Sequence, residues 1–109
     1  MPAISIKKTY IDILEALGSA NTIVEDAIRK YLIDKSVERV EKSRRKIEEF
    51  ERRYDSNYAK FIDAISNDEG LKAIEKISPN WEEDMTEWEY WEKELAEWKT
   101  RLEDILMKS

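Results

Sequence analysis

The chain has no cysteine and no histidine among its 109 residues. Without cysteine there is no disulfide and no thiolate metal site, and without histidine the commonest metal ligand and the usual general base are missing. Glycine and proline occur only twice each. No apolar run approaches the about 20 residues of a membrane span, and Met1–Lys8 lacks the apolar core of a signal peptide. We therefore expect a cytoplasmic protein without a membrane segment.

A stretch of 47 residues, from Asn21 to Asn67, contains neither Gly nor Pro and is rich in Glu, Lys and Arg. These residues favour helix, and the stretch predicts a long helix with a break near 55–57, where Asp, Ser and Asn follow one another. From Val37 onward its apolar positions form a thin seam spaced by three, four or seven residues. Such a seam is typical of a coiled coil and needs a partner helix, from the same chain or from a second copy.

The charge is uneven, because residues 1–80 hold 15 Lys and Arg against 15 Asp and Glu, whereas residues 81–109 hold 4 against 10. All four Trp lie in the second segment, at three-four spacing with Leu and Ile. This pattern predicts a bulky helix that starts near Pro79, with Ser78 as its N-cap, and folds back along the long helix. The expected fold is all-α, an elongated helical hairpin or coiled coil with a long central helix and room for one short N-terminal strand. Long thin helices bury little apolar surface, so we also expect a homodimer.

The N-terminal part has a pattern of its own. Residues 3–7 alternate apolar and polar side chains, which predicts a short strand. Residues 9–17 predict a short helix that Gly18 ends in the left-handed conformation, and Thr22 and Glu25 match a capping box that starts the long helix. This order resembles the ribbon-helix-helix fold of small prokaryotic DNA-binding dimers, and a plain helical hairpin is the alternative. The resemblance implies that outward strand residues bind DNA, namely Ser5, Lys7 and Lys8.

Three further segments follow one another along the chain: Val40 to Tyr54, Tyr58 to Phe61, and the acidic Trp81 to Glu89. Their order resembles the antitoxin-like small helical proteins of prokaryotic toxin–antitoxin pairs, especially partners of TumE-type toxins. The resemblance implies a chain that neutralises a small toxin. Independently, an acidic aromatic helix suits a basic protein surface, since Trp is enriched at interface hot spots and complementary charge speeds association. The expected partner-binding residues are Trp81, Asp84, Glu87, Trp88, Trp91 and Trp98.

The same features have plainer interpretations. The Trp spacing also suits a packed core. Core packing and partner binding are therefore both possible roles of these residues. The best candidate for a hard-cation site is the carboxylate group of Glu83, Asp84 and Glu87, but helical metal sites usually add His. We find no phosphate-binding loop and no nucleophile–base pair, and therefore expect no enzyme and no cofactor.

The sequence thus divides into three segments. Residues 1–33 form a cap for dimerisation or DNA binding, residues 34–78 a charged helix with its break and a short helix, and residues 79–109 an acidic Trp-rich helix. The first hypothesis is a protein-binding module that neutralises a small basic toxin through the last helix. The alternatives are a DNA-binding regulator that uses the first segment, and a purely structural coiled-coil oligomer.

Overall fold

The computed structural model describes residues 5–107. This part of the chain folds into five helices without a strand: α1 (Lys8–Leu17), α2 (Ala20–Tyr54), α3 (Tyr58–Ile65), α4 (Asp68–Ile77) and α5 (Trp81–Met107). The expected all-helical class is confirmed. Residues 5–7 do not form the expected strand, because the Lys7 carbonyl accepts hydrogen bonds from the N–H groups of Tyr10 and Ile11 and so starts α1. Positions 3 and 4 lie outside the described residues.

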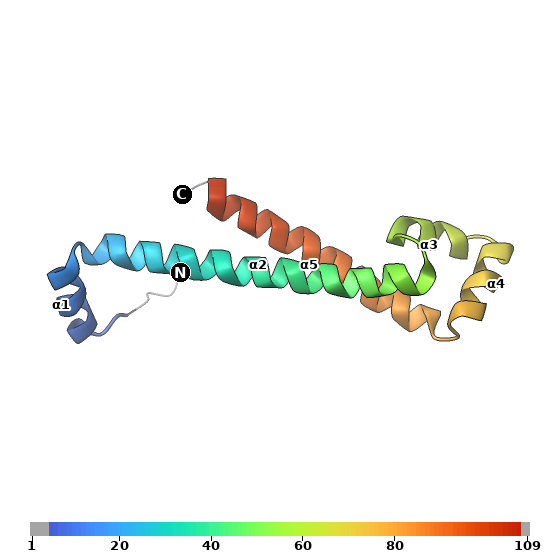
Figure 1. Ribbon diagram of the computed structural model, residues 1–109, viewed down its shortest axis with the longest axis horizontal. Helices are drawn as coiled ribbons and strands as arrows, with labels where there is room; N and C mark the ends of the chain where they lie inside the picture. Colours follow the sequence, from blue (N-terminus) through green and yellow to red (C-terminus); the bar gives the residue numbers. More distant parts are fainter. Residues whose placement is uncertain (1–4, 108–109) are drawn as a thin grey trace.

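The molecule is a rod with principal extents of 69 × 25 × 24 Å. Helix α2 spans most of its length, α3 and α4 form the turn at one end, and α5 returns antiparallel beside α2 (Figure 1). Helix α1 lies at the opposite end. The expected hairpin around a long central helix is therefore confirmed.

The break after the central helix is where the sequence places it. Asp55 is left-handed, with φ 49° and ψ 44°, and its N–H bonds to the carbonyl of Glu51. Asn57 then caps α3, since its side-chain oxygen accepts the N–H of Lys60 at 2.9 Å. Asp and Asn suit these positions because their short polar side chains tolerate the left-handed region and satisfy free N–H groups at helix starts. The chain can therefore turn sharply here.

The corner between α3 and α4 depends on a glycine inside a helix. Helix α4 begins at Asp68, and the Asn67 side chain caps it by accepting the N–H of Gly70 at 2.7 Å. A Cβ at Gly70 would lie 2.1 Å from the backbone oxygen of Ala64. Gly70 thus lets the start of α4 pack against the end of α3.

Three details at helix ends correct the sequence interpretation. The capping box is wrong, because α2 begins at Ala20, whose N–H bonds to the Glu15 carboxylate at 3.3 Å, and Thr22 and Glu25 lie inside the helix. Gly18 has a φ of 161°, which is extended and not left-handed.

The third correction concerns the start of α5. This helix begins at Trp81, after a turn in which the Ser78 hydroxyl accepts the N–H of Asn80 at 3.2 Å. Ser78 therefore holds the turn before the helix and is not its N-cap.

The seam along α2 differs in part from the expected one. The buried side chains on α2 towards α5 include Ser36 and Ser43 together with Ile47 and Phe50, whereas Val37 is exposed. The Ser43 hydroxyl is satisfied by the carbonyl of Arg39 at 2.9 Å. Small side chains allow a bulky neighbouring helix to approach closely, so the thin seam of α2 and the Trp seam of α5 fit each other.

Candidate functional site

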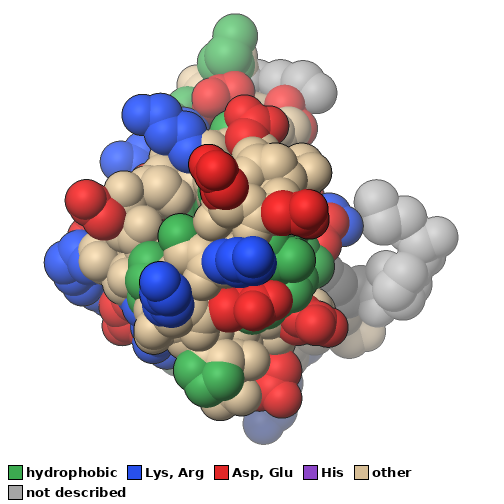
Figure 2. All heavy atoms as spheres, turned by 90° about the vertical axis from the view of Figure 1, so that its right-hand side faces the viewer, with side chains coloured by type: hydrophobic (Ala, Val, Ile, Leu, Met, Phe, Trp, Pro, Cys, Tyr) green, Lys and Arg blue, Asp and Glu red, His purple; other side chains and the backbone are tan. Residues whose placement is uncertain are grey.

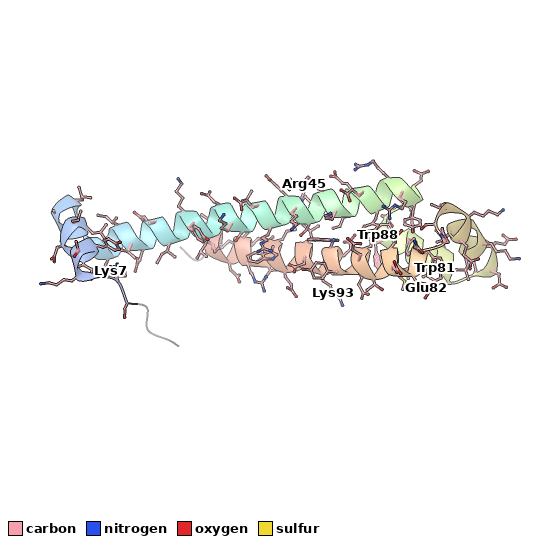
Figure 3. All side chains as sticks on the ribbon, turned by 90° about the horizontal axis from the view of Figure 1, so that it is seen from below. Lys7, Arg45, Trp81, Glu82, Trp88 and Lys93 are labelled. Carbon is pink, nitrogen blue, oxygen red and sulfur yellow. The ribbon has the colours of Figure 1, made fainter. Side chains whose placement is uncertain are left out.

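The Trp-rich helix contributes the centre of the core. Trp88 has an exposed fraction of 0%, and its ring lies between α2 and α5, near the turn (Figure 3). The ring centroids of four neighbours lie within 6 Å of it: Phe50 at 5.6 Å, Tyr54 at 5.9 Å, Tyr58 at 5.4 Å and Phe61 at 5.1 Å. Trp88 therefore joins three helices, and its ring has no surface to offer a partner while α5 is packed.

The other Trp residues of α5 are partly buried along the same seam. Lys42 Nζ lies 5.6 Å from the ring centroid of Trp91. Arg39 Cζ and Arg101 Cζ lie 5.7 Å and 4.5 Å from the ring centroid of Trp98. Cations over an indole face are attracted by the ring quadrupole, by about 0.5–1 kcal/mol at exposed sites. These contacts favour the core interpretation of the Trp spacing, in which the rings attach α5 to α2.

Asp84 makes a tertiary contact that the sequence did not indicate. Its carboxylate accepts hydrogen bonds from Arg53 Nη1 at 2.8 Å and from the Tyr54 hydroxyl. This contact raises the pKa of Arg53, while burial and then the bond to Asp84 raise the pKa of Tyr54 to about 12. No local pattern predicts it, because Asp84 meets partners 30 and 31 positions earlier in the chain.

The carboxylates of α5 do not assemble into a metal site. Within residues 5–107, no group of three or more acidic side chains is placed to hold an ion. Asp84 turns towards α2, whereas Glu83 and Glu87 are exposed. The hard-cation candidate of the sequence is therefore not brought together.

The Tyr54–Asp84 contact predicts a loss of stability in alkali. Because the pKa of this phenol is about 12 in the folded chain and about 10 in the unfolded chain, the free energy of unfolding does not depend on it below pH 10. As the pH rises from 10 to 12 the unfolded chain loses this proton first, so the free energy of unfolding falls, on the order of 2 kcal/mol. We expect the free energy of unfolding of Tyr54→Phe to be lower than that of the wild type by about 1 kcal/mol at pH 8, and the sign of this difference to reverse by pH 12. Denaturant unfolding at several pH values measures this; a constant difference would contradict it.

The outer face of α5 is acidic and carries an aromatic ring. Exposed on it are Glu82, Glu83, Glu87, Glu89, Tyr90, Lys93, Glu97 and Arg101. Lys93 pairs with Glu89 at 3.3 Å and Arg101 with Glu97 at 3.7 Å. Tyr90 is 52% exposed, and its hydrogen bond to Glu94 raises its pKa. Both bases on this face are thus neutralised by neighbouring acids.

Glu92 lies at the edge of this face, one turn after Trp88. Partial burial raises the pKa of its carboxyl, and the nearby indole N–H of Trp88 offsets this in part. The buried Nε1 atoms of Trp88 and Trp91 nevertheless have no well-formed hydrogen bond within the described residues. The indole groups therefore contribute to the core through their rings.

The expected DNA-binding residues lie at the far end of the rod. Ser5, Lys7 and Lys8 are all exposed, and the Nζ of Lys7 lies 5.8 Å from the ring of Tyr10. Figure 3 places Lys7 beside α1, well away from Trp81 and Trp88. The two groups of candidate residues do not form a common site.

The end of the rod formed by α3 and α4 offers no patch of one charge. Viewed from this end, basic side chains lie mainly on the left and acidic ones mainly at the upper centre and right, with both signs meeting in the middle (Figure 2). The acidic character of α5 therefore does not extend over the turn.

Comparisons of the chain with protein-family models, with curated proteins and with solved structures gave no match. Within residues 5–107, none of the helices combines the length and the apolar character that crossing a membrane requires.

Proposed function

We propose that this chain is a non-enzymatic, antitoxin-like protein-binding module that neutralises a small basic toxin in the cytoplasm. The observation that carries the proposal is the outer face of α5, where acidic side chains surround the exposed ring of Tyr90. A basic protein surface is the complement of such a face.

The charges on this face favour a cationic partner. Its two bases already pair with Glu89 and Glu97, and Glu83 and Glu87 make no ion pair within the described residues. Residues 81–109 carry a surplus of six acids, which equals the net charge of the whole chain. Long-range attraction therefore steers a basic protein towards α5, and Tyr90 supplies an aromatic anchor at the centre of the face.

The Trp residues support the same function indirectly. Because their rings attach α5 to α2, the acidic face is presented on a rigid helix before any partner arrives. A preorganised surface avoids the entropic cost of ordering on binding. Of the residues expected from the sequence, Glu87 contacts the partner directly in this proposal, while Trp81, Trp88, Trp91, Trp98 and Asp84 hold the helix in place.

The test combines growth and binding. Cells express a candidate toxin, a small basic protein whose gene neighbours that of this chain, with and without the chain itself. We expect growth arrest that co-expression relieves, and co-purification of the two proteins. The Glu83→Lys/Glu87→Lys variant should weaken binding by about tenfold or more and lose the rescue, because two attractive charges become repulsive.

Matched controls separate the hypotheses. Glu41→Lys/Glu49→Lys makes the same charge change at exposed positions of α2 and should keep the rescue. Lys7→Ala/Lys8→Ala should also keep it, but would weaken an operator complex if the chain were a DNA-binding regulator. No arrest and no complex, or equal loss of rescue in both charge-reversal variants, would overturn the proposal.

A further inference from the structure

The end of the rod that carries α1 exposes many large hydrophobic side chains. Among the described residues, thirteen large hydrophobic side chains are exposed, and nine of them belong to α1, the residues before it or the first half of α2. We call eight of these nine the N-terminal apolar surface: Ile6, Tyr10, Ile11, Ile13, Leu17, Ile28, Tyr31 and Leu32. Val37 is left out, because it follows Ile28 by nine positions and therefore lies on the opposite side of α2. Soluble monomers rarely expose apolar patches larger than a few hundred Å². So many large side chains at one end indicate a surface that another molecule covers.

Helix α1 is not stabilised by a core of this chain. It contains ten residues, and none of them is buried. Between α1 and α2 lies a groove of about 320 Å³, lined by Ile6, Ile11, Ala20 and Val24 with three polar neighbours. An isolated helix of this length is marginal in water. Helix α1 therefore needs apolar cover from outside its own hairpin.

Helix α5 does not provide this cover. Figure 1 shows that it ends beside the first half of α2 and diverges from it there. Its last turn adds further apolar surface, because Leu106 is 52% and Met107 82% exposed. The first half of α2 thus continues beyond the packed hairpin as a single helix.

We propose that a second copy of this chain covers the N-terminal apolar surface, giving a two-fold symmetric homodimer. Charge selects this occupant. Residues 5–37 hold five Lys and Arg and five Asp and Glu, whereas residues 38–109 hold 14 against 20. Two copies that meet at the neutral end bring no net charge together, whereas contact through the remainder would oppose −6 with −6. A symmetric interface of this kind is self-complementary.

The composition of this surface suits a protein–protein interface. A standard interface buries about 800 Å² on each partner and has an apolar centre of aromatic and aliphatic side chains. The N-terminal apolar surface supplies side chains of this kind, and two of them, Ile6 and Ile11, line the groove between α1 and α2. The acidic face of α5 stays free in the dimer, so this inference does not depend on the proposed neutralising function.

Ile28 and Ile77 provide a matched test. Both are isoleucines on helices and both are 48% exposed, but only Ile28 belongs to the N-terminal apolar surface. Sedimentation velocity over a range of concentrations should give twice the chain mass of 13.0 kDa for the wild type and for Ile77→Asp. Ile28→Asp should weaken association by at least about a hundredfold, because it buries an unpaired carboxylate.

A second measurement guards against loss of folding in the variant. Since the chain has no cysteine, Tyr31→Cys and Ile77→Cys can each be spin-labelled at a single site. Labels at position 31 should show short distances between copies, and labels at position 77 should not. A wild type that stays monomeric at its highest soluble concentration, a dimer that Ile28→Asp leaves unchanged, or short distances only at position 77 would overturn the proposal. A chain that stays monomeric and binds lipid vesicles or a different protein through this surface would also overturn the proposal.

Discussion

Replacing Trp88 with Ala is expected to lower the free energy of unfolding by about 3–5 kcal/mol. The ring is completely buried and contacts aromatic side chains on both α2 and α3. Its loss leaves a cavity between α2, α3 and α5. Along the rest of the hairpin the apolar seam of α2 is thin, so other contacts do not replace the packing that the Trp88 ring provides.

Denaturant unfolding followed by circular dichroism measures this effect. Tyr90→Ala is the matched control, because it removes an aromatic side chain two positions along the same helix from a site that is 52% exposed. The control should cost less than about 1 kcal/mol. Similar losses in the two variants would contradict the assignment of Trp88 to the core.

Gly70→Ala is expected to destabilise the protein by about 1–3 kcal/mol or more, although alanine is the better helix former. In an open helix this change would stabilise by up to about 1 kcal/mol. Here the new Cβ would lie 2.1 Å from the backbone oxygen of Ala64, so α3 and α4 must separate. The sign of the change therefore reports whether the two helices pack closely.

The second glycine provides the control for this prediction. A Cβ at Gly18 would meet only Ile23 Cδ1, at an ordinary contact distance of 3.5 Å. Its extended backbone suits any residue, so Gly18→Ala should change stability by less than about 0.5 kcal/mol. Thermal unfolding of both variants measures these effects. A Gly70→Ala protein that is more stable than the wild type would show that α3 and α4 do not pack closely at this corner.

The sequence predicted those features that depend on local chemistry. The break at 55–57 follows from three residues that favour turns and caps, and the hairpin follows from two seams of matching spacing. The expected strand does not form over residues 5–7, because two alternating apolar residues are a weak signal and a strand also needs a neighbour with which to pair. The capping box was also wrong. The first N–H of α2, that of Ala20, is bonded by Glu15 of the preceding helix and not by a residue at the start of α2.

Contacts between distant residues could not be predicted. The bond from Tyr54 to Asp84 and the packing of Gly70 on Ala64 depend on how the helices are placed, and neither leaves a sequence pattern. The Trp residues show a different limit. Their spacing is the same for a core as for an exposed binding stripe, and only the burial of Trp88 distinguishes the two.

Amide hydrogen exchange of the free protein tests most directly whether α5 is folded on α2 before a partner binds. We expect the amides around Trp88, Trp91 and Leu95 to be protected as strongly as those around Ile47 and Phe50, because the two helices share one core. If instead α5 exchanges like an unstructured peptide while α2 remains protected, the Trp residues are available to a partner. The rigid acidic face proposed here would then be wrong.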